Sequence, residues 1–354
     1  MLLTFCRVSA ILSLLFGVSL TNAFGQTVRL GTANSNHQTF AITYTSVPSK
    51  IYWPREGLDV KLQGLGGANA IIEALDAGLV DVAAPAASAV FALMQARPNT
   101  DLVAFYTHTS GFNAMPAVPR SSAIQTIRDL EGKTIGVQNL ANSQVALTKA
   151  LLTLEGGDAS KLKFRAVGEG IEMVRALQTN QVDALAVFDA MYALVEGEGV
   201  PLRILSSASV NAQKVGFIGV LVTKRSYFEK NRETLIKLAR GMAKASTFAK
   251  ANPEAAVRIH WDVFPASKPR GLSEANAMRR GVEPMLARLE NTFEVEGLWG
   301  NSTPEQIDGY VNLLLEGGVL KQRVEASKVW DPSLLKEANN FDRQAVIAEA
   351  LASK

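Results

Sequence analysis

The sequence predicts an α/β protein with two lobes, each built on a mainly parallel sheet flanked by helices. Two observations predict this class: a strand–helix–strand unit that occurs twice, and a length greater than one compact core usually holds. The first unit spans residues 58–83 and the second spans residues 162–185, an offset of about 102 positions. Because two strands joined through a helix pair in parallel, we expect each unit to form the middle of one lobe.

Each unit has the same internal order. A strand of alternating or continuous apolar residues, at 58–62 and at 162–166, leads into a glycine turn, an amphipathic helix and a second short strand. The helix is expected to stop at Gly78 in the first unit and at Asn180 in the second. Its apolar positions recur at helical spacing: Ile71, Ile72 and Leu75 in the first unit, and Ile171, Val174 and Leu177 in the second.

The remaining elements lie outside the two units. A leading strand precedes each unit, at residues 28–31 and 134–137, and two further strands at 103–108 and 216–222 are expected to join the lobes as a hinge. The rest of the chain is helical by pattern, with start signals such as Thr303 before Pro304. The expected helices cover residues 225–252, 253–263, 273–293, 303–317 and 333–352.

The sequence predicts that the chain has three parts: a signal peptide and two lobes. Residues 1–25 form a signal peptide, and 329 of the 354 residues remain after it. Residues 26–107 and 216–354 form a discontinuous lobe I, and residues 108–215 form lobe II. The C-terminal helices are expected to pack on lobe I as an extension.

The first 25 residues carry the pattern of an export signal. A single positive charge at Arg7 precedes an apolar stretch at residues 8–20, and the small residues Ala23 and Gly25 follow it. The pattern allows cleavage after Gly25 or after Ala23. The stretch is shorter than the roughly 20 residues that a membrane-spanning helix needs. We therefore expect export to a bacterial periplasm.

Composition and cysteine content exclude several classes of protein. Hydrophobic residues make up 47% and charged residues 19%, a globular balance, and a net charge of +3 gives no reason to expect a nucleic acid or membrane partner. The only cysteine, Cys6, lies in the predicted signal, ahead of the apolar stretch and away from the position that a lipoprotein modifies. The three histidines, at 37, 108 and 260, have no metal-ligand spacing. We expect no metal, no cofactor and no enzymatic activity.

Several segments carry a family resemblance. They are YWPREGLDV at residues 52–60, DLEGKTIGV at 129–137, and the stretches 74–83 and 176–187. In these the chain resembles the periplasmic substrate-binding proteins of ABC importers, in the group that binds aliphatic sulfonates, taurine, nitrate or pyrimidine precursors of thiamine. The resemblance implies the type II periplasmic binding fold, with lobes that close over a small polar organic ligand: a sulfonate, a taurine-like compound, a pyrimidine or a related organic anion.

The resemblance also implies partners and alternatives. The expected partner is an ABC permease in the inner membrane, and we expect the receptor to be a monomer. A sensory receptor would use the same lobes, with a signalling partner in place of the permease. An enzyme of the pyrimidine-synthesis type would also share the fold, but those relatives carry a cysteine-rich iron-binding segment that this chain lacks after residue 25.

The ligand is expected beyond the carboxyl ends of the parallel strands, where helix N-termini present free backbone N–H groups. The loops at these ends contain Asn, Ser, Gly and two acids, but neither Lys nor Arg, so an anion would rely on helix N-termini and neutral donors. The candidate ligand-binding residues in these loops are Asn34, His37, Gly67, Ala68, Asn69, Ser88, Asn142, Ser143, Glu169 and Asp189.

Several of these candidates can also be explained without a ligand. The glycine loop before Asn69 could be only a tight turn, and Asn142 or Ser143 could only cap a helix. His37 could be an ordinary surface histidine, although its place resembles that in the thiamine-precursor binders, where it would stack on a ring. Glu169 and Asp189 could be solvated loop acids; facing a ligand, they would suit an amine or a ring N–H.

Overall fold

The computed structural model describes residues 25–33 and 37–354. The predicted signal peptide, except Gly25, and the candidate residue Asn34 lie outside the described residues. Within these ranges no helix combines the length and the apolar character needed to cross a bilayer.

The first sheet joins distant parts of the chain. Its order is β2-β1-β3-β10-β4, with β1 paired in parallel to both β2 and β3, and β10 antiparallel to β3 and β4. Alternate apolar residues of β1, Val28 and Leu30, are fully buried. The strands are β1 (Gln26–Thr32), β2 (Leu58–Gly64), β3 (Val82–Ala84), β4 (Leu102–Gly111) and β10 (Gly216–Lys224).

The second sheet repeats this plan. Its order is β7-β6-β8-β5-β9, and β6 pairs in parallel with β7 and β8 as β1 does with β2 and β3. β5 runs antiparallel to β8 and β9. The predicted internal repeat and the mainly parallel centre of each sheet are therefore confirmed. The strands are β5 (Ala117–Pro119), β6 (Thr134–Val137), β7 (Lys163–Ala166), β8 (Ala184–Leu185) and β9 (Leu202–Ile204).

Helices follow the parallel strands in both sheets. The predicted stops of α2 and α5 are confirmed, because Gly78 and Asn180 adopt φ values of 71° and 54°, the left-handed region that ends a helix. We call each sheet with its own helices a lobe, lobe I first; the residue boundaries of the lobes stay a prediction. The helices are α1 (Trp53–Arg55), α2 (Ala68–Asp76), α3 (Ala87–Ala96), α4 (Ser143–Leu154), α5 (Ile171–Gln178) and α6 (Asp189–Gly197).

The C-terminal part of the chain is helical as predicted, with two breaks that the pattern did not reveal. Asn231 ends the first helix by donating its backbone N–H and its side-chain amide to the carbonyl of Tyr227. Asp342 starts the last helix by capping the N–H of Ala345 at 3.0 Å. The helices are α7 (Arg225–Lys230), α8 (Arg232–Ala251), α9 (Pro253–Val263), α10 (Glu274–Glu290), α11 (Pro304–Glu316), α12 (Ala326–Val329), α13 (Leu335–Ala338) and α14 (Arg343–Ala352).

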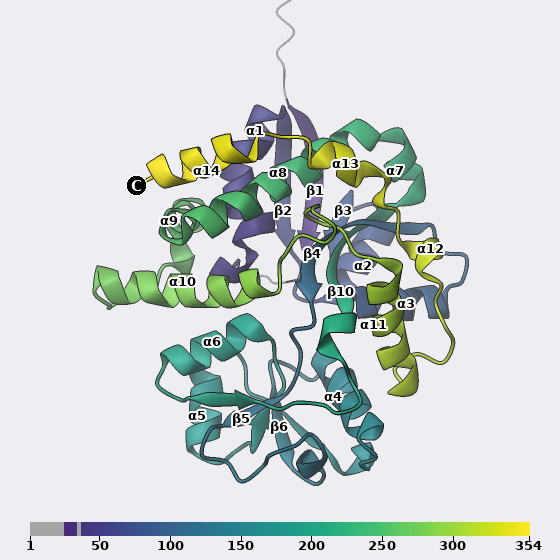
Figure 1. Ribbon diagram of the computed structural model, residues 1–354, viewed down its shortest axis with the longest axis vertical. Helices are drawn as coiled ribbons and strands as arrows, with labels where there is room; N and C mark the ends of the chain where they lie inside the picture. The colour runs from purple at the N-terminus through teal and green to yellow at the C-terminus, as the bar shows by residue number, and fades with distance from the viewer. Residues whose placement is uncertain (1–24, 34–36) are drawn as a thin grey trace, which may run out of the picture.

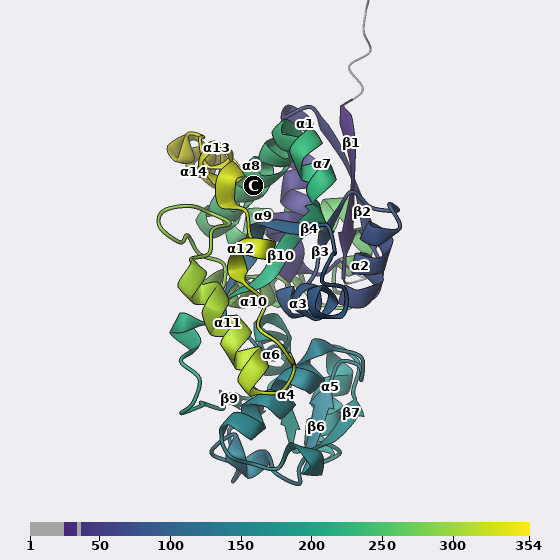
Figure 2. The same cartoon turned by 90° about the vertical axis from the view of Figure 1, so that its right-hand side faces the viewer.

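The C-terminal extension contacts both lobes. α8 packs on lobe I, where the indole N–H of Trp53 donates to the carbonyl of Leu238 at 2.9 Å, and α14 lies along α8. α10, however, lies against α6, and α11 lies against α4, both in lobe II (Figures 1 and 2). The prediction that the extension packs on lobe I is thus incomplete, since α10 and α11 bridge the two lobes.

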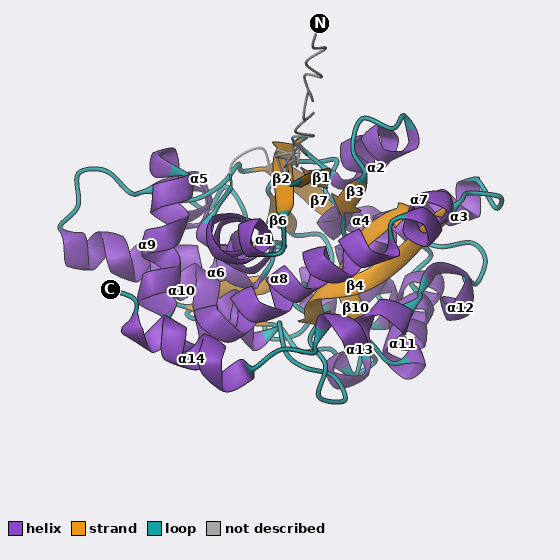
Figure 3. Ribbon diagram, turned by 90° about the horizontal axis from the view of Figure 1, so that it is seen from above, coloured by secondary structure: helices purple, strands orange, loops and turns teal. Residues whose placement is uncertain are grey.

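Two neighbouring strands link the lobes. β4 and β10 lie side by side in the first sheet, as Figure 3 shows, and β4 ends six residues before β5 begins in the second sheet. The hydrophobic core is continuous across this connection and includes residues of both sheets. The two crossing strands were predicted from the sequence at residues 103–108 and 216–222.

Close packing of α8 on Trp53 gives a stability prediction. A Cβ at Gly241 would collide with the buried indole of Trp53, which is fully enclosed. We expect Gly241→Ala to lower the free energy of unfolding by about 1–3 kcal/mol, although alanine favours a helix interior over glycine by about 1 kcal/mol. Urea unfolding measures the change. Glu233→Ala on the same helix is the control, and equal stability of Gly241→Ala and wild type would contradict the packing.

Candidate ligand-binding site

The candidate site lies where the loops after the parallel strands of the two lobes meet. Glu169, which follows β7, accepts a hydrogen bond from the side-chain amide of Gln38 in lobe I at 2.6 Å. The amide of Gln138, which follows β6, also donates to Glu169. The carboxylate of Glu169 is therefore held by one amide from each lobe, and the lobes are in direct contact at this point.

A chain of polar groups runs on from Glu169 to the start of α4. The Gln138 carbonyl oxygen accepts from the Asn142 amide at 3.2 Å, and the Asn142 oxygen accepts from the backbone N–H of Gln144 at 3.1 Å. The Ser143 hydroxyl points to the same Asn142 oxygen at 3.4 Å. Asn142 thus caps α4 and also belongs to the network that reaches across the lobes.

Asp189, at the start of α6, is engaged by an arginine. Arg288 of α10 donates from Nε and Nη2 to its carboxylate at 2.7 to 3.1 Å, and the Asn291 amide adds a bond of 3.0 Å. Both charged side chains are buried, with 8% and 9% of their surface exposed. Burial alone would lower the pKa of Arg288, but the charge and hydrogen bonds of Asp189 outweigh burial and raise that pKa.

Aromatic rings surround this ion pair. The Arg288 guanidinium lies 5.1 Å from the ring centre of Phe40 and 5.2 Å from that of Phe188. The two rings come from different lobes and meet edge to face at 5.3 Å. The sequence offered no signal for Arg288, because it occupies a helix far from the strand loops and its partner lies 99 positions away.

His37 and His260 form a second cluster in lobe I. The ring of His37 lies over Phe264, with centres 4.4 Å apart, and burial lowers its pKa. His260 contacts the backbone carbonyl of His37 through Nε2 at 3.1 Å and the hydroxyl of Ser46 through Nδ1 at 3.0 Å. Because a carbonyl only accepts, Nε2 carries the proton, and His260 is neutral, with a pKa that burial lowers to about 4.

The remaining candidates in lobe I lie at helix starts. Gly67 precedes α2 with a φ of 152°, Ala68 begins that helix, and Asn69 is exposed on its first turn. Ser88 is buried on the first turn of α3; its hydroxyl lies near that of Tyr310, yet no hydrogen bond of normal length and angle satisfies it. The N-termini of α2 and α3 therefore follow the carboxyl ends of β2 and β3.

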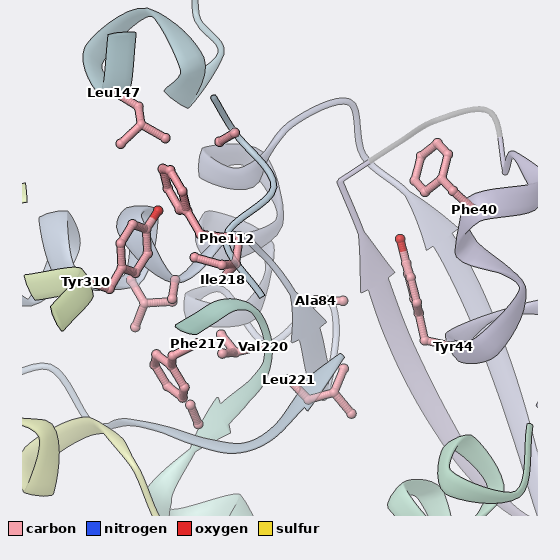
Figure 4. Close-up of a cluster of buried hydrophobic side chains, with 14 of the residues drawn as sticks. Phe40, Tyr44, Ala84, Phe112, Leu147, Phe217, Ile218, Val220, Leu221 and Tyr310 are labelled. Carbon is pink, nitrogen blue, oxygen red and sulfur yellow. The ribbon is translucent and has the colours of Figure 1, made fainter. Parts of the chain in front are cut away.

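Two of the buried polar atoms without a hydrogen bond belong to these helix starts. One is the Ser88 hydroxyl of lobe I, and the other is the Gln144 side-chain oxygen of lobe II. Figure 4 shows Leu147, one turn beyond Gln144 on α4, above Phe112 and Tyr310, with Phe40 and Tyr44 on the other side of Ala84. Buried polar atoms are almost always paired, so these two unpaired atoms are candidates for contact with a bound molecule.

Two surface cavities lie away from the candidate residues. One of about 620 Å³ opens beside Arg97, Asp101 and Lys224, and one of about 350 Å³ lies beside Glu254 and Arg258. Neither is lined by a candidate residue. In the described ranges no group of three or more His, Cys, Asp or Glu side chains is placed to hold a metal ion.

Comparisons with known proteins agree with this architecture. The model of the family described as "NMT1/THI5 like" matches residues 39–256. No curated protein matches the sequence. The alkanesulfonate-binding protein SsuA from Xanthomonas axonopodis, bound to MOPS, has 18% identity and a TM-score of 0.61, with 86% of this chain and 98% of that chain covered.

Two further solved structures widen the comparison. The periplasmic aliphatic sulphonate-binding protein SsuA from Escherichia coli has 18% identity and a TM-score of 0.61, covering 87% of this chain and 93% of that one. The desulfurization enzyme DSZB has 13% identity and a TM-score of 0.57, covering 89% and 99%. At these identities the likeness establishes the fold, and the predicted type II periplasmic binding fold is confirmed.

Buried histidines predict a pH dependence of stability. Burial, together with the charge of Arg288, lowers the pKa of His108 to about 3, and burial lowers that of His260 to about 4. Between pH 6.5 and about pH 4 the unfolded chain binds protons at both residues while the folded chain does not. Their contribution to stability is therefore complete above pH 6.5 and is lost as the pH falls toward 4.

The measurement is the slope of unfolding free energy against pH between pH 6 and pH 5. We expect each histidine to contribute about 1.4 kcal/mol per pH unit, so His108→Gln should lose that share of the slope. His37→Gln, with a partly buried ring, is the comparison. A wild-type slope retained in His108→Gln would show that His108 is protonated in the folded protein.

Proposed function

The chain belongs to the NMT1/THI5-like family, and we propose that it is the solute-binding receptor of an ABC-type importer, working in the periplasm. In this proposal the lobes close over a small polar organic ligand and the closed form is presented to a permease. The observation that carries it is the pair of equivalent sheets joined by β4 and β10, whose strand-end loops meet through Glu169. Such a pair of lobes gives a permease two distinguishable shapes.

The proposed ligand contacts come from both lobes. The unsatisfied Ser88 hydroxyl and Gln144 oxygen would gain partners, and the N-termini of α2, α3 and α4 would supply backbone N–H groups. Glu169 would accept from a donor on the ligand, in exchange for one of its glutamine amides. The other proposed contacts are Asn34, His37, Gly67, Ala68, Asn69, Asn142 and Ser143.

The ligand class remains a set of candidates. The SsuA structures, named for alkanesulfonates and aliphatic sulphonates, support a sulfonate or a taurine-like compound, and the family name is compatible with a pyrimidine. The cleft loops carry neither Lys nor Arg, and Arg288 is already paired with Asp189. These facts favour a neutral, zwitterionic or singly charged ligand over a multiply charged anion.

Two alternatives keep the same lobes. A sensory receptor would hand the closed form to a signalling protein, and a neighbouring histidine-kinase gene in place of permease and ATPase genes would favour it. An enzyme is the weaker alternative; DSZB has the fold, but the only cysteine of this chain is Cys6, in the predicted signal. Chemical turnover of a bound compound would favour the enzyme.

The direct test is a ligand screen on the purified protein by thermal shift, followed by calorimetry. The compounds are alkanesulfonates, taurine, nitrate, hydroxymethylpyrimidines and aromatic carboxylates. A true ligand at 100 times its Kd stabilises the folded state by about 2.7 kcal/mol and raises Tm. Failure of every class to raise Tm would refute the proposal.

Ser88 gives a residue-level prediction. Ser88→Ala removes a buried hydroxyl that has no hydrogen bond, so we expect no loss of stability in the empty protein. The same change should weaken ligand binding by about 10-fold, since a hydrogen bond contributes about 1 kcal/mol or more. Calorimetric titration and thermal unfolding measure the two effects.

Ser246→Ala is the matched control, because its buried hydroxyl donates to the carbonyl of Met242 at 3.1 Å within α8 and lies outside the proposed contacts. We expect it to lower Tm and to leave affinity unchanged. If Ser88→Ala instead lowers Tm and leaves affinity unchanged, Ser88 serves the fold and has no contact with ligand.

A further inference from the structure

Two ion pairs connect α10 to lobe II, and they differ in burial. Arg288 pairs with Asp189 at 2.7 Å, with 8% and 9% of the side chains exposed. Arg280 pairs with Glu198 at 2.7 Å, with 33% and 21% exposed. Figure 1 shows α10 lying along α6, and the two pairs join α10 to the first residue of α6 and to Glu198, just after its last residue. The chain thus offers a buried pair and a more solvated one in the same interface.

The Arg288 side of the pair is fixed to lobe I and to a connecting strand. The carbonyl of Asn291, just beyond α10, accepts from the backbone N–H groups of Ser110 and Gly111 in β4, at 2.7 and 3.0 Å. The Thr292 hydroxyl donates to the carbonyl of His108 at 3.2 Å. The end of α10 is therefore tied to the strand that leads out of lobe I.

The Asp189 side belongs to lobe II. Asp189 is the first residue of α6, and the neighbouring Phe188 packs on Phe40 of lobe I. Separating the lobes would draw Asp189 and Phe188 away from Arg288 and Phe40 and admit water to all four. Because the end of α10 is hydrogen-bonded to β4 of lobe I, we take α10 to move with lobe I, so that the ion pair and its aromatic walls form only while the lobes are shut.

We propose that Arg288 and Asp189 are the closing contact of the receptor, a buried pair of charges that sets how much of the empty protein is shut. This inference rests on the proposed function only in taking the lobes to open and close. Asp189 is then a positioning residue that holds the lobes together, in place of a ligand contact.

The energetics of buried charges give the direction of each variant. Removing one partner leaves the other charge buried without compensation, and opening the lobes relieves this by admitting water. Asp189→Ala should therefore open the protein. Replacing both partners by apolar side chains removes the uncompensated charge and leaves an apolar contact between Phe40 and Phe188, so Arg288→Met with Asp189→Leu should close it again.

The measurement is the distance between spin labels on the two lobes, in the full chain without ligand. Cys6→Ser removes the only cysteine, and Glu73→Cys on α2 and Arg175→Cys on α5 place labels at exposed, equivalent positions in the two units. Figure 2 shows α2 and α5 on the same side of the molecule, one in each lobe. Double electron–electron resonance then reports the shut and open populations.

We expect the empty wild type to show mainly the short distance. In Asp189→Ala the ratio of shut to open protein should fall by about 100-fold or more, and in the double apolar variant the short distance should return. Glu198→Ala, which breaks the more solvated pair, should change the ratio by less than about 5-fold.

The outcomes separate this inference from the proposed function, because no ligand takes part. A mainly open wild type, an Asp189→Ala variant that stays shut, or an equal opening by Glu198→Ala would each overturn it. If Asp189→Ala does not fold, Asp189→Asn preserves the shape and still removes the charge, and it must show a partial opening. If no ligand is found in the screen but the distance changes occur as expected, the proposed receptor function is refuted. The proposal that Arg288 and Asp189 form the closing contact is then still supported.

Discussion

Parallel pairing on both sides of one central strand is the constraint on which the rest of this structure depends. β1 lies between β2 and β3, and β6 lies between β7 and β8, so the carboxyl ends of three strands gather at one edge of each sheet. Every such strand must be followed by a helix that crosses back. The N-termini of α2, α3, α4, α5 and α6 consequently lie at those edges, and the loops before α4 and α5 and the start of α6 place Gln138, Glu169 and Asp189 there.

The antiparallel strands β4 and β10 have a different role, because they connect the two lobes. β4 and β10 pair with each other inside lobe I, so both connections leave the sheet side by side. Close approach along this pair depends on glycine. A Cβ at Gly219 would collide with the ring of His108, and one at Gly111 would lie 2.8 Å from the Asn291 side-chain oxygen. The connection is therefore packed against the same α10 end that positions Arg288.

Most of the fold was predictable because local sequence patterns determine it. Most of the site contacts were not predictable, because they join residues far apart in the sequence. β6 was predicted to its limits, and the stops at Gly78 and Asn180 follow from the backbone conformations that those residues tolerate. Glu169 and Asp189 were placed at a strand edge by the repeat. Their partners Gln38 and Arg288 lie 131 and 99 positions away, and no periodicity links a helix residue to a loop across a lobe interface. The sequence therefore predicted where the lobes meet but not what holds them.

The charges within the site affect which ligands can bind there. Arg288 cancels the charge of Asp189, but the two glutamine amides that hold Glu169 are neutral and leave its negative charge in place. The anionic end of a ligand is repelled near Glu169 and is favoured at the N-termini of α2, α3 and α4, where backbone N–H groups and helix dipoles are positive. A molecule with an acidic group at one end and an amine or ring N–H at the other satisfies both conditions. Among the candidate ligands, we therefore propose that a taurine-like zwitterion meets both conditions better than nitrate or a simple alkanesulfonate, which have no donor for Glu169.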